Sequence, residues 1–141
     1  MCKNGLIVIV IGLTALFVPH VSAADKLSDA EISQKLIGSW IVPPDSTDYD
    51  PTTPYSLETF KPDGTYTFLI FGDPACRAIT QQIQVRWMIE NGVLISIGPN
   101  GNEVHDEVLS IKNEIMTLHS LEDGTTYTRK KALTCSKAVA A

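Results

Sequence analysis

Residues 79–97 read ITQQIQVRWMIE, NG and VLISI, and this stretch decides the fold class. Residues 79–90 alternate between two faces, as expected for a strand that buries one side. The mainly apolar face carries, with Gln81 as the exception, the residues Ile79, Ile83, Val85, Trp87 and Ile89. Asn91-Gly92 is the strongest short hairpin signal in the chain, and the apolar run Val93–Ile97 follows it. The stretch therefore predicts two antiparallel strands joined by a tight turn.

Similar runs, rich in β-branched and aromatic residues and separated by turn residues, continue on both sides. With the first hairpin they predict eight strands: Ser39–Val42, Tyr55–Phe60, Thr65–Phe71, Ile79–Glu90, Val93–Ile97, Glu103–Ile111, Ile115–Ser120 and Thr125–Lys130. Short turns make neighbours in sequence antiparallel neighbours in space. Because an open meander leaves two unprotected edges, we predict an all-β fold, an eight-stranded antiparallel up-and-down barrel. A two-sheet β-sandwich is the alternative fold.

Two further segments accompany the strands. Ser28 and Glu31 have the spacing of a capping box, which predicts a short N-terminal helix over about residues 29–37. Residues 43–54 contain four prolines and three aspartates. This composition predicts a long loop between the first two strands, because proline cannot donate a hydrogen bond to a strand ladder.

The first 23 residues have the pattern of a secretory signal peptide. Lys3 precedes the apolar run Leu6–Val18, and Val21 and Ala23 occupy the two positions before a cleavage point where small residues are expected. The apolar run is too short to cross a bilayer comfortably. We therefore expect residues 24–141 to form a single domain that is not membrane-spanning and is periplasmic or secreted.

The chain has three cysteines, and Cys2 lies in the predicted signal. In an oxidising compartment the remaining two, Cys76 and Cys135, are expected to pair as a structural disulfide. Neither lies in a Cys-x-x-Cys motif, which argues against a reactive thiol. The disulfide would hold residues 134–141 against the side of the fold.

Composition and motifs disfavour several functions. The chain carries 11 Lys and Arg against 16 Asp and Glu, which disfavours a nucleic-acid binder. It contains no motif for a nucleophile with its base, a zinc protease or a phosphate loop, so we expect no enzyme activity, catalytic residue or cofactor. The aspartates Asp45, Asp48 and Asp50 lack the spacing of a calcium loop. His105 and His119 are expected on adjacent strands with an offset of about three residues, too far to share a zinc ion, so no metal site is predicted.

Gly38-Ser39-Trp40 lies between the predicted helix and the first strand, and Arg129 lies on the last strand. In this arrangement the chain resembles the lipocalins and their calycin relatives, although it lacks the long C-terminal helix of that family. The resemblance implies a structural role for Gly38, Trp40 and Arg129 at the base of the barrel. It implies in particular that the Arg129 guanidinium lies across the Trp40 indole as a cation–π pair. It also implies that the loop 43–54 covers the open mouth.

The resemblance further implies a non-enzymatic protein that binds or carries a small hydrophobic ligand in the barrel. The side chains expected to line that site are Tyr66, Phe68, Ile83, Val85 and Trp87. The same kind of side chain would equally fill a solid core, because small barrels can be packed entirely by side chains. The alternative function is a protein-binding module of the inhibitor or immunity type, acting through loops 43–54 and 72–78. The acidic balance would then favour a basic protein partner.

Overall fold

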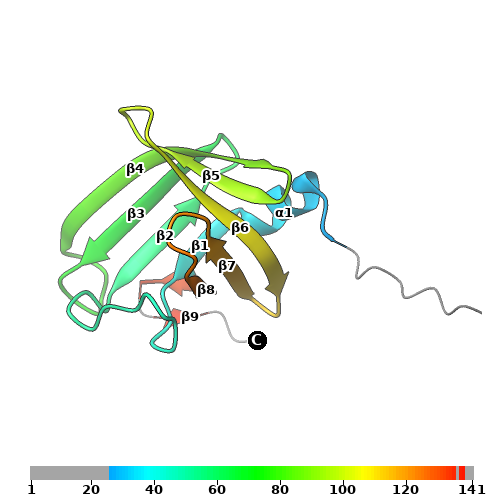
Figure 1. The fold of residues 1–141 in the computed structure, drawn as a ribbon. Helices are drawn as coiled ribbons and strands as arrows, with labels where there is room; N and C mark the ends of the chain where they lie inside the picture. The colour runs from blue at the N-terminus through cyan, green and yellow to red at the C-terminus, as the bar shows by residue number, and fades with distance from the viewer. Residues whose placement is uncertain (1–25, 136, 139–141) are drawn as a thin grey trace, which may run out of the picture.

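A computed structural model describes residues 26–135, 137 and 138, and these residues form a closed antiparallel barrel with one short helix (Figure 1). The predicted signal peptide lies outside the described residues. The elements are α1 (Asp29–Leu36), β1 (Gly38–Ile41), β2 (Ser56–Phe60), β3 (Thr65–Phe71), β4 (Ile79–Glu90), β5 (Val93–Ile97), β6 (Glu103–Lys112), β7 (Ile115–Ser120), β8 (Thr126–Thr134) and β9 (Lys137–Ala138).

Closure of the barrel depends on the pairing of β1 with β8. Every strand pairs antiparallel with the next one in sequence, and β1 pairs in addition with β8. At this seam Trp40 lies opposite Lys131 and Ile41 lies opposite Lys130. The eight strands β1–β8 therefore close an up-and-down barrel, which confirms the predicted fold and not the sandwich alternative.

The strand bounds agree with the prediction within one residue for every strand before the last. The last predicted strand was expected to end at Lys130, but β8 continues to Thr134. Two of its additional residues pair with other strands. Lys131 pairs with β1, which is distant in sequence, and Ala132 pairs with β9, which follows directly. The two-residue strand β9 was not predicted.

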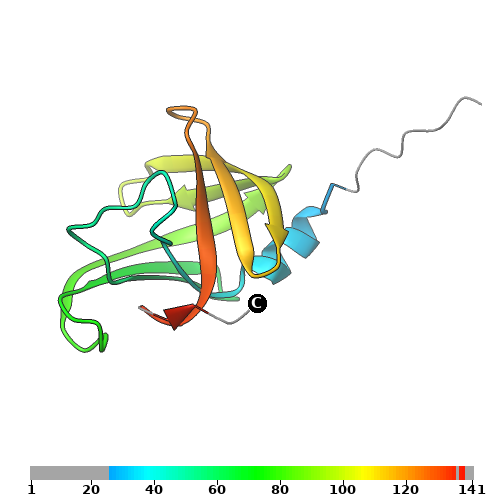
Figure 2. The same ribbon diagram turned by 90° about the horizontal axis from the view of Figure 1, so that it is seen from below.

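Helix α1 closes one end of the barrel, as Figure 2 shows, whereas the loops 43–54 and 72–78 lie at the opposite end. The predicted capping box is present, because the Ser28 hydroxyl accepts from the Glu31 backbone N–H and the Glu31 carboxylate accepts from the Ser28 N–H. The Asp29 carboxylate accepts the backbone N–H groups of Asn91 and Gly92, each at 2.8 Å. These two bonds anchor the helix to the turn between β4 and β5.

The apolar core fills the interior next to α1. Its buried members are Ile32, Leu36, Trp40, Phe60, Trp87, Leu94, Val108, Ile111, Met116 and Leu118. Trp87 packs edge-on against Phe60, with 5.5 Å between the ring centroids, and its indole N–H donates to the Lys61 carbonyl at 3.1 Å. Burial of each large apolar side chain stabilises the fold by about 1.5–3 kcal/mol. The half of the barrel beside the helix is therefore a solid core.

The cation at the seam differs from the prediction. Lys131, not Arg129, lies over Trp40, with its Nζ atom 4.4 Å from the ring centroid. Lys131 is directly opposite Trp40 in the ladder, whereas Arg129 is two residues, about 7 Å, further along the strand. Gly38 fits the same contact, because it has φ +122° and a Cβ atom there would lie 3.1 Å from the Lys131 side chain. The predicted pair of Arg129 with Trp40 is thus wrong.

Candidate functional site

The neighbouring strands β3 and β4 bring four of the five predicted ligand residues together. In the ladders Tyr66 lies opposite Val85 and Phe68 lies opposite Ile83, so these side chains share one inner surface. Tyr66, Phe68 and Val85 are half-buried, and Ile83, nearest the mouth, is 41 % exposed. Trp87 lies next along β4 but belongs to the solid core described above. The inner wall is therefore filled near the helix and open near the loops.

A cavity of about 250 Å³ lies between this wall and the loop 43–54. Its lining residues are Val42, Asp48, Tyr49, Asp50, Thr53, Ser56, Glu58, Tyr66, Phe68 and Arg129. A second space of about 60 Å³ lies deeper among Leu94, Ser96, Asp106, Leu118 and Tyr127, and it shares the lining residues Glu58, Tyr66 and Arg129 with the first. The candidate site therefore has an aromatic wall and a charged floor.

The loop 43–54 covers the mouth because it is tied to β8. The Ser46 hydroxyl accepts from the Thr128 backbone N–H at 3.0 Å, and the Thr47 hydroxyl donates to the Thr126 carbonyl at 2.7 Å. Both bonds lie along β8 beyond the end of β1, where none of the described strands pairs with that edge. The loop continues the closure of the barrel and carries Asp48 and Tyr49 to the cavity.

Arg129 joins three parts of the site. Its side chain is 9 % exposed and its Nε atom donates to Glu58 Oε1 at 2.8 Å. Its two terminal nitrogens donate to the Asp48 carboxylate at 3.0 and 2.7 Å. Forked pairing of a guanidinium with a carboxylate is directional, so these bonds fix the distance between β8, β2 and the covering loop. Arg129 also lies 4.5 Å over the ring of Tyr127.

The two carboxylates respond differently to this environment. Burial raises the pKa of Glu58, and the charge and hydrogen bond of Arg129 only partly offset that effect. Burial also tends to raise the pKa of Asp48, but the hydrogen bonds of Arg129 and Ser46 outweigh it and the pKa lies below its usual value. Glu58 and Asp48 together raise the pKa of Arg129 against the effect of burial, so Arg129 stays charged.

A third carboxylate, Asp106, lies deeper in the interior and is 6 % exposed. Burial raises its pKa, against the opposing effects of a hydrogen bond from Tyr127 and the charge of Arg129. The interior thus places three carboxylates around one guanidinium. A positively charged group, or a neutral hydrogen-bond donor, fits this balance of charge better than an anion does.

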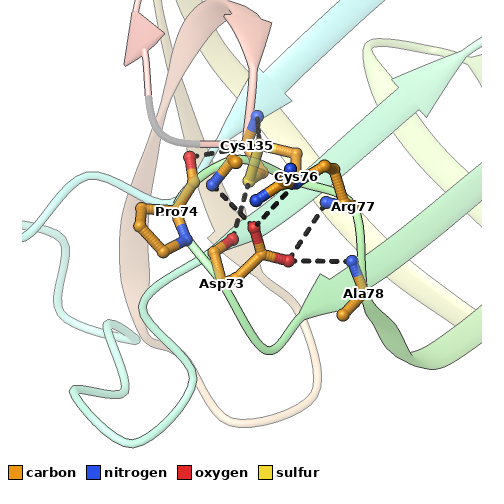
Figure 3. Close-up of a disulfide and its surroundings, with 7 residues drawn as sticks. Asp73, Pro74, Cys76, Arg77, Ala78 and Cys135 are labelled. Atoms are coloured by element: carbon orange, nitrogen blue, oxygen red, sulfur yellow. Dashed lines mark hydrogen bonds and ion pairs between the residues drawn. A yellow bond between two sulfur atoms is a disulfide. The ribbon is translucent and has the colours of Figure 1, made fainter.

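The rim of the mouth is braced by the predicted disulfide, which is present between Cys76 and Cys135 (Figure 3). Beside it, the Asp73 carboxylate accepts backbone N–H groups of Ala75, Arg77 and Ala78 at 2.8–3.1 Å. These three bonds lower the pKa of Asp73, the bond from Ala78 most of all. The loop 72–78 is therefore held in one shape although it is exposed.

No metal site emerges in the described part of the chain, where no group of three His, Cys, Asp or Glu side chains is placed to hold an ion. The Asp48 carboxylate pairs with Arg129, and the Asp50 carboxylate accepts from Thr52. His119 lies opposite Glu107, so it is offset from His105 by two residues and not by the predicted three. A β-bulge between Val108 and Ser110 explains the difference.

A larger hollow of about 500 Å³ lies beside α1, at the closed end. Its lining includes Lys35, Lys112 and Lys131 and none of the predicted ligand residues. The Lys131 ammonium there already donates to the Ile37 carbonyl at 2.9 Å. We therefore place the candidate site at the mouth, where apolar wall and buried charges meet.

Sequence reasoning missed the charged floor of the site. Glu58 and Asp48 were not singled out as site residues, and Arg129 was assigned to the seam. One signal was available in the sequence: Glu58 lies two residues before Phe60 and so shares its face of the strand. The structure shows that this face is buried, where a carboxylate requires a partner. Arg129 could not be identified as the partner of Glu58 from the sequence, because that requires the register of the last strand.

Comparison with protein-family models, with curated proteins and with solved structures gave no match for this chain. Within the described residues, no helix has the length and apolar character needed to span a membrane. The barrel, its disulfide and the composition of its mouth are therefore the observations from which a function can be argued.

Proposed function

We propose that this protein is an exported, non-enzymatic, lipocalin-like carrier that binds a small amphipathic molecule at the mouth of its barrel. The observation that carries the proposal is the cavity of about 250 Å³ between an aromatic wall and a charged floor, in a barrel whose other half is solid. Sites for drug-sized ligands start at about 300 Å³, so the ligand is small or only partly enclosed.

The apolar part of the ligand would rest on Tyr66, Phe68 and Ile83. These side chains are neighbours on one inner surface, and Ile83 is still 41 % exposed. Covering such surface gains about 25 cal/mol for each Å² removed from water. An exposed apolar patch inside a barrel mouth is thus a source of affinity for a ring or a short alkyl chain.

The polar part of the ligand would meet Glu58 at the floor. Arg129 already donates to two carboxylates, and a third, Asp106, lies close behind. A ligand carboxylate or phosphate would add a further negative charge, and Arg129 is the sole cation among the described residues that line the two spaces. We therefore propose a neutral or positively charged head group that donates hydrogen bonds to Glu58.

Membership of the lipocalin-like group is supported by the order of elements and by the base of the barrel. The Gly38-Ser39-Trp40 motif leads from the helix into the first strand, and a cation of the last strand, Lys131, lies on the Trp40 ring. Export is supported by the predicted signal peptide and by the disulfide, which persists in oxidising compartments.

The proposal can be tested with two probes that share one skeleton. N-phenyl-1-naphthylamine is neutral and carries one N–H donor, whereas 1-anilinonaphthalene-8-sulfonate adds a sulfonate to it. We expect fluorescence titration to show the neutral probe binding at least about tenfold more tightly, a difference of about 1.4 kcal/mol. Equal or tighter binding of the sulfonate would contradict the assigned head group.

Matched variants locate the binding. Phe68→Ala removes the whole phenyl ring from the wall and should weaken binding of the neutral probe by at least about tenfold. Leu69→Ala, the next residue on β3, changes the outer surface and should leave binding unchanged. If both variants bind like the original protein, the cavity is not the site.

The alternative of a protein-binding module rests on the braced loop 72–78. A loop fixed by a disulfide and by Asp73 loses little conformational entropy on binding a partner. Its exposed Arg77, however, gives it a positive charge at the tip, which does not fit the predicted basic partner. Failure of both probes to bind would favour this alternative over the carrier.

A further inference from the structure

The deeper space of about 60 Å³, behind the cavity at the mouth, is lined mainly by polar side chains. Those that can form hydrogen bonds are Glu58, Tyr66, Ser96, Asp106, Tyr127 and Arg129, and the others are apolar residues of the core. A space of this size can hold a water molecule or a group of similar size, such as an ammonium. The deeper space is therefore suited to a small polar group at the end of a ligand.

Two carboxylates face each other across the deeper space. Glu58 lies on β2 and Asp106 on β6, and strands four positions apart lie on opposite walls of a closed eight-stranded barrel. The Glu58 side chain is 7 % exposed, Asp106 is 6 % exposed, and both line the space. The charge of Asp106 contributes to the raised pKa of Glu58, so the two groups interact although they belong to distant strands.

Arg129 satisfies only part of this negative charge. Its Nε atom donates to Glu58 Oε1, and its terminal nitrogens donate to Asp48 and to the Thr128 carbonyl. Among the described residues, none donates to the second oxygen of Glu58, Oε2. Asp106 accepts a hydrogen bond from the Tyr127 hydroxyl but forms no ion pair with any described residue. Buried carboxylates normally have a cation or several donors, so both groups have accepting capacity left for a ligand.

We propose that the deeper space receives the ammonium of a primary amine, held between Glu58 and Asp106, while the apolar part of the same ligand lies against Phe68. The proposal rests on the carrier function proposed above and narrows its head group to a cation. An ammonium is compact and has three donors, enough for Glu58 Oε2, Asp106 and one hydroxyl of Tyr66 or Ser96. A quaternary ammonium has no N–H donor, which leaves amines as the matching class.

The ladder places the two parts of such a ligand close together. Glu58 lies directly opposite Phe68 in the pairing of β2 with β3. Side chains opposite each other on one face are about 5 Å apart at their Cβ atoms. The cavity and the deeper space share Glu58, Tyr66 and Arg129 as lining residues, so the two spaces are adjacent. A short linker between ring and nitrogen is therefore enough, and Asp106 is the residue that distinguishes an amine from a neutral donor.

Three ligands that share the phenylethyl group test the charge of the head group. They are 2-phenylethylamine, 2-phenylethanol and 3-phenylpropanoate, which are cationic, neutral and anionic near pH 8. Isothermal titration of the disulfide-intact protein should show the amine binding at least about tenfold more tightly than the alcohol, and the carboxylate most weakly. An amine that binds no more tightly than the alcohol overturns the proposal.

Matched variants of β6 test the role of Asp106. Asp106→Asn keeps the size of the side chain and an acceptor for Tyr127 but removes the charge, and should weaken the amine by at least about tenfold. Binding of the neutral N-phenyl-1-naphthylamine should not change. Glu107→Gln makes the same change of charge at the next residue, on the outer face of the strand, and should leave the amine unaffected. Equal losses of amine affinity in both variants overturn the proposal.

The outcomes separate this proposal from the carrier function. If N-phenyl-1-naphthylamine binds but the amine has no advantage over the alcohol, the carrier function stands and the amine assignment is wrong. If none of the ligands binds, both are wrong. Circular dichroism establishes that Asp106→Asn is folded, and a crystal structure of the original protein with 2-phenylethylamine decides if it is not. The ligand nitrogen between Glu58 and Asp106 supports the proposal, and a nitrogen elsewhere overturns it.

Discussion

Replacing Arg129 by methionine tests whether the charged floor holds the barrel mouth together. The substitution keeps the length of the side chain but removes one hydrogen bond to Glu58 and two to Asp48. Removing one partner of a buried ion pair costs about 3–5 kcal/mol. The Glu58 side chain is 7 % exposed and that of Asp48 is 38 % exposed, so the loss at Glu58 dominates. We expect Arg129→Met to lower the free energy of unfolding by about 3 kcal/mol or more near pH 8.

The sign of the pH dependence follows from Glu58. Its pKa in the folded protein is raised by burial and would rise further without Arg129. A carboxyl group with a raised folded pKa favours the fold at low pH, and this contribution is lost as the pH rises through that pKa. The penalty of Arg129→Met should therefore be smaller near pH 5 than near pH 8, as measured by urea unfolding at both.

A double variant completes the test. Arg129→Met with Glu58→Leu replaces the buried pair by apolar groups, which is often neutral or stabilising in other proteins. It should be at least about 1 kcal/mol more stable than Arg129→Met alone. The reasoning is refuted if Arg129→Met costs less than about 1 kcal/mol, if its cost is the same at both pH values, or if the two substitutions simply add.

Three further predictions concern the frame of the site. Replacing Cys76 and Cys135 together by alanine should lower stability by about 2–4 kcal/mol, and an unchanged melting temperature would show that the disulfide does not brace the fold. Asp29→Ala leaves the N–H groups of exposed Asn91 and buried Gly92 without their acceptor and should cost about 1–3 kcal/mol, mainly through Gly92, with faster amide exchange at that turn; Asp29→Asn, as a control, should cost less. Lys131→Met should cost about 1–2 kcal/mol and change the fluorescence of Trp40, whereas a Trp40 signal that responds to Arg129→Met instead would contradict the seam.

Local patterns predicted most of the fold. The period-two alternation of residues 79–90 and the Asn-Gly turn after them fixed the first hairpin, and the prolines of residues 43–54 marked the covering loop. These features depend on neighbours in sequence, so they can be recognised in a single chain. The pairing of Cys76 with Cys135 was likewise predictable, because no other partner remained once Cys2 was assigned to the signal.

The features that were missed depend on register between distant strands. The observed register of β1 and β8 sets Lys131, and not Arg129, opposite Trp40, a difference of two residues from the predicted contact. Arg129 therefore does not contact Trp40, and its side chain binds Glu58 and Asp48 in the interior. The extension of β8 to Thr134 depends on β1 and β9 in the same way. Sequence alternation shows which face a residue occupies but not which residue it meets across the seam.

The central claim is that the mouth of the barrel holds a small amphipathic molecule between Phe68 and Glu58. A crystal structure of the protein with N-phenyl-1-naphthylamine tests it most directly. We expect the rings of the probe against Phe68 and Tyr66, and its N–H directed to the Glu58 carboxylate. Side chains that fill this cavity, or a probe bound beside α1 with the mouth empty, would contradict the account.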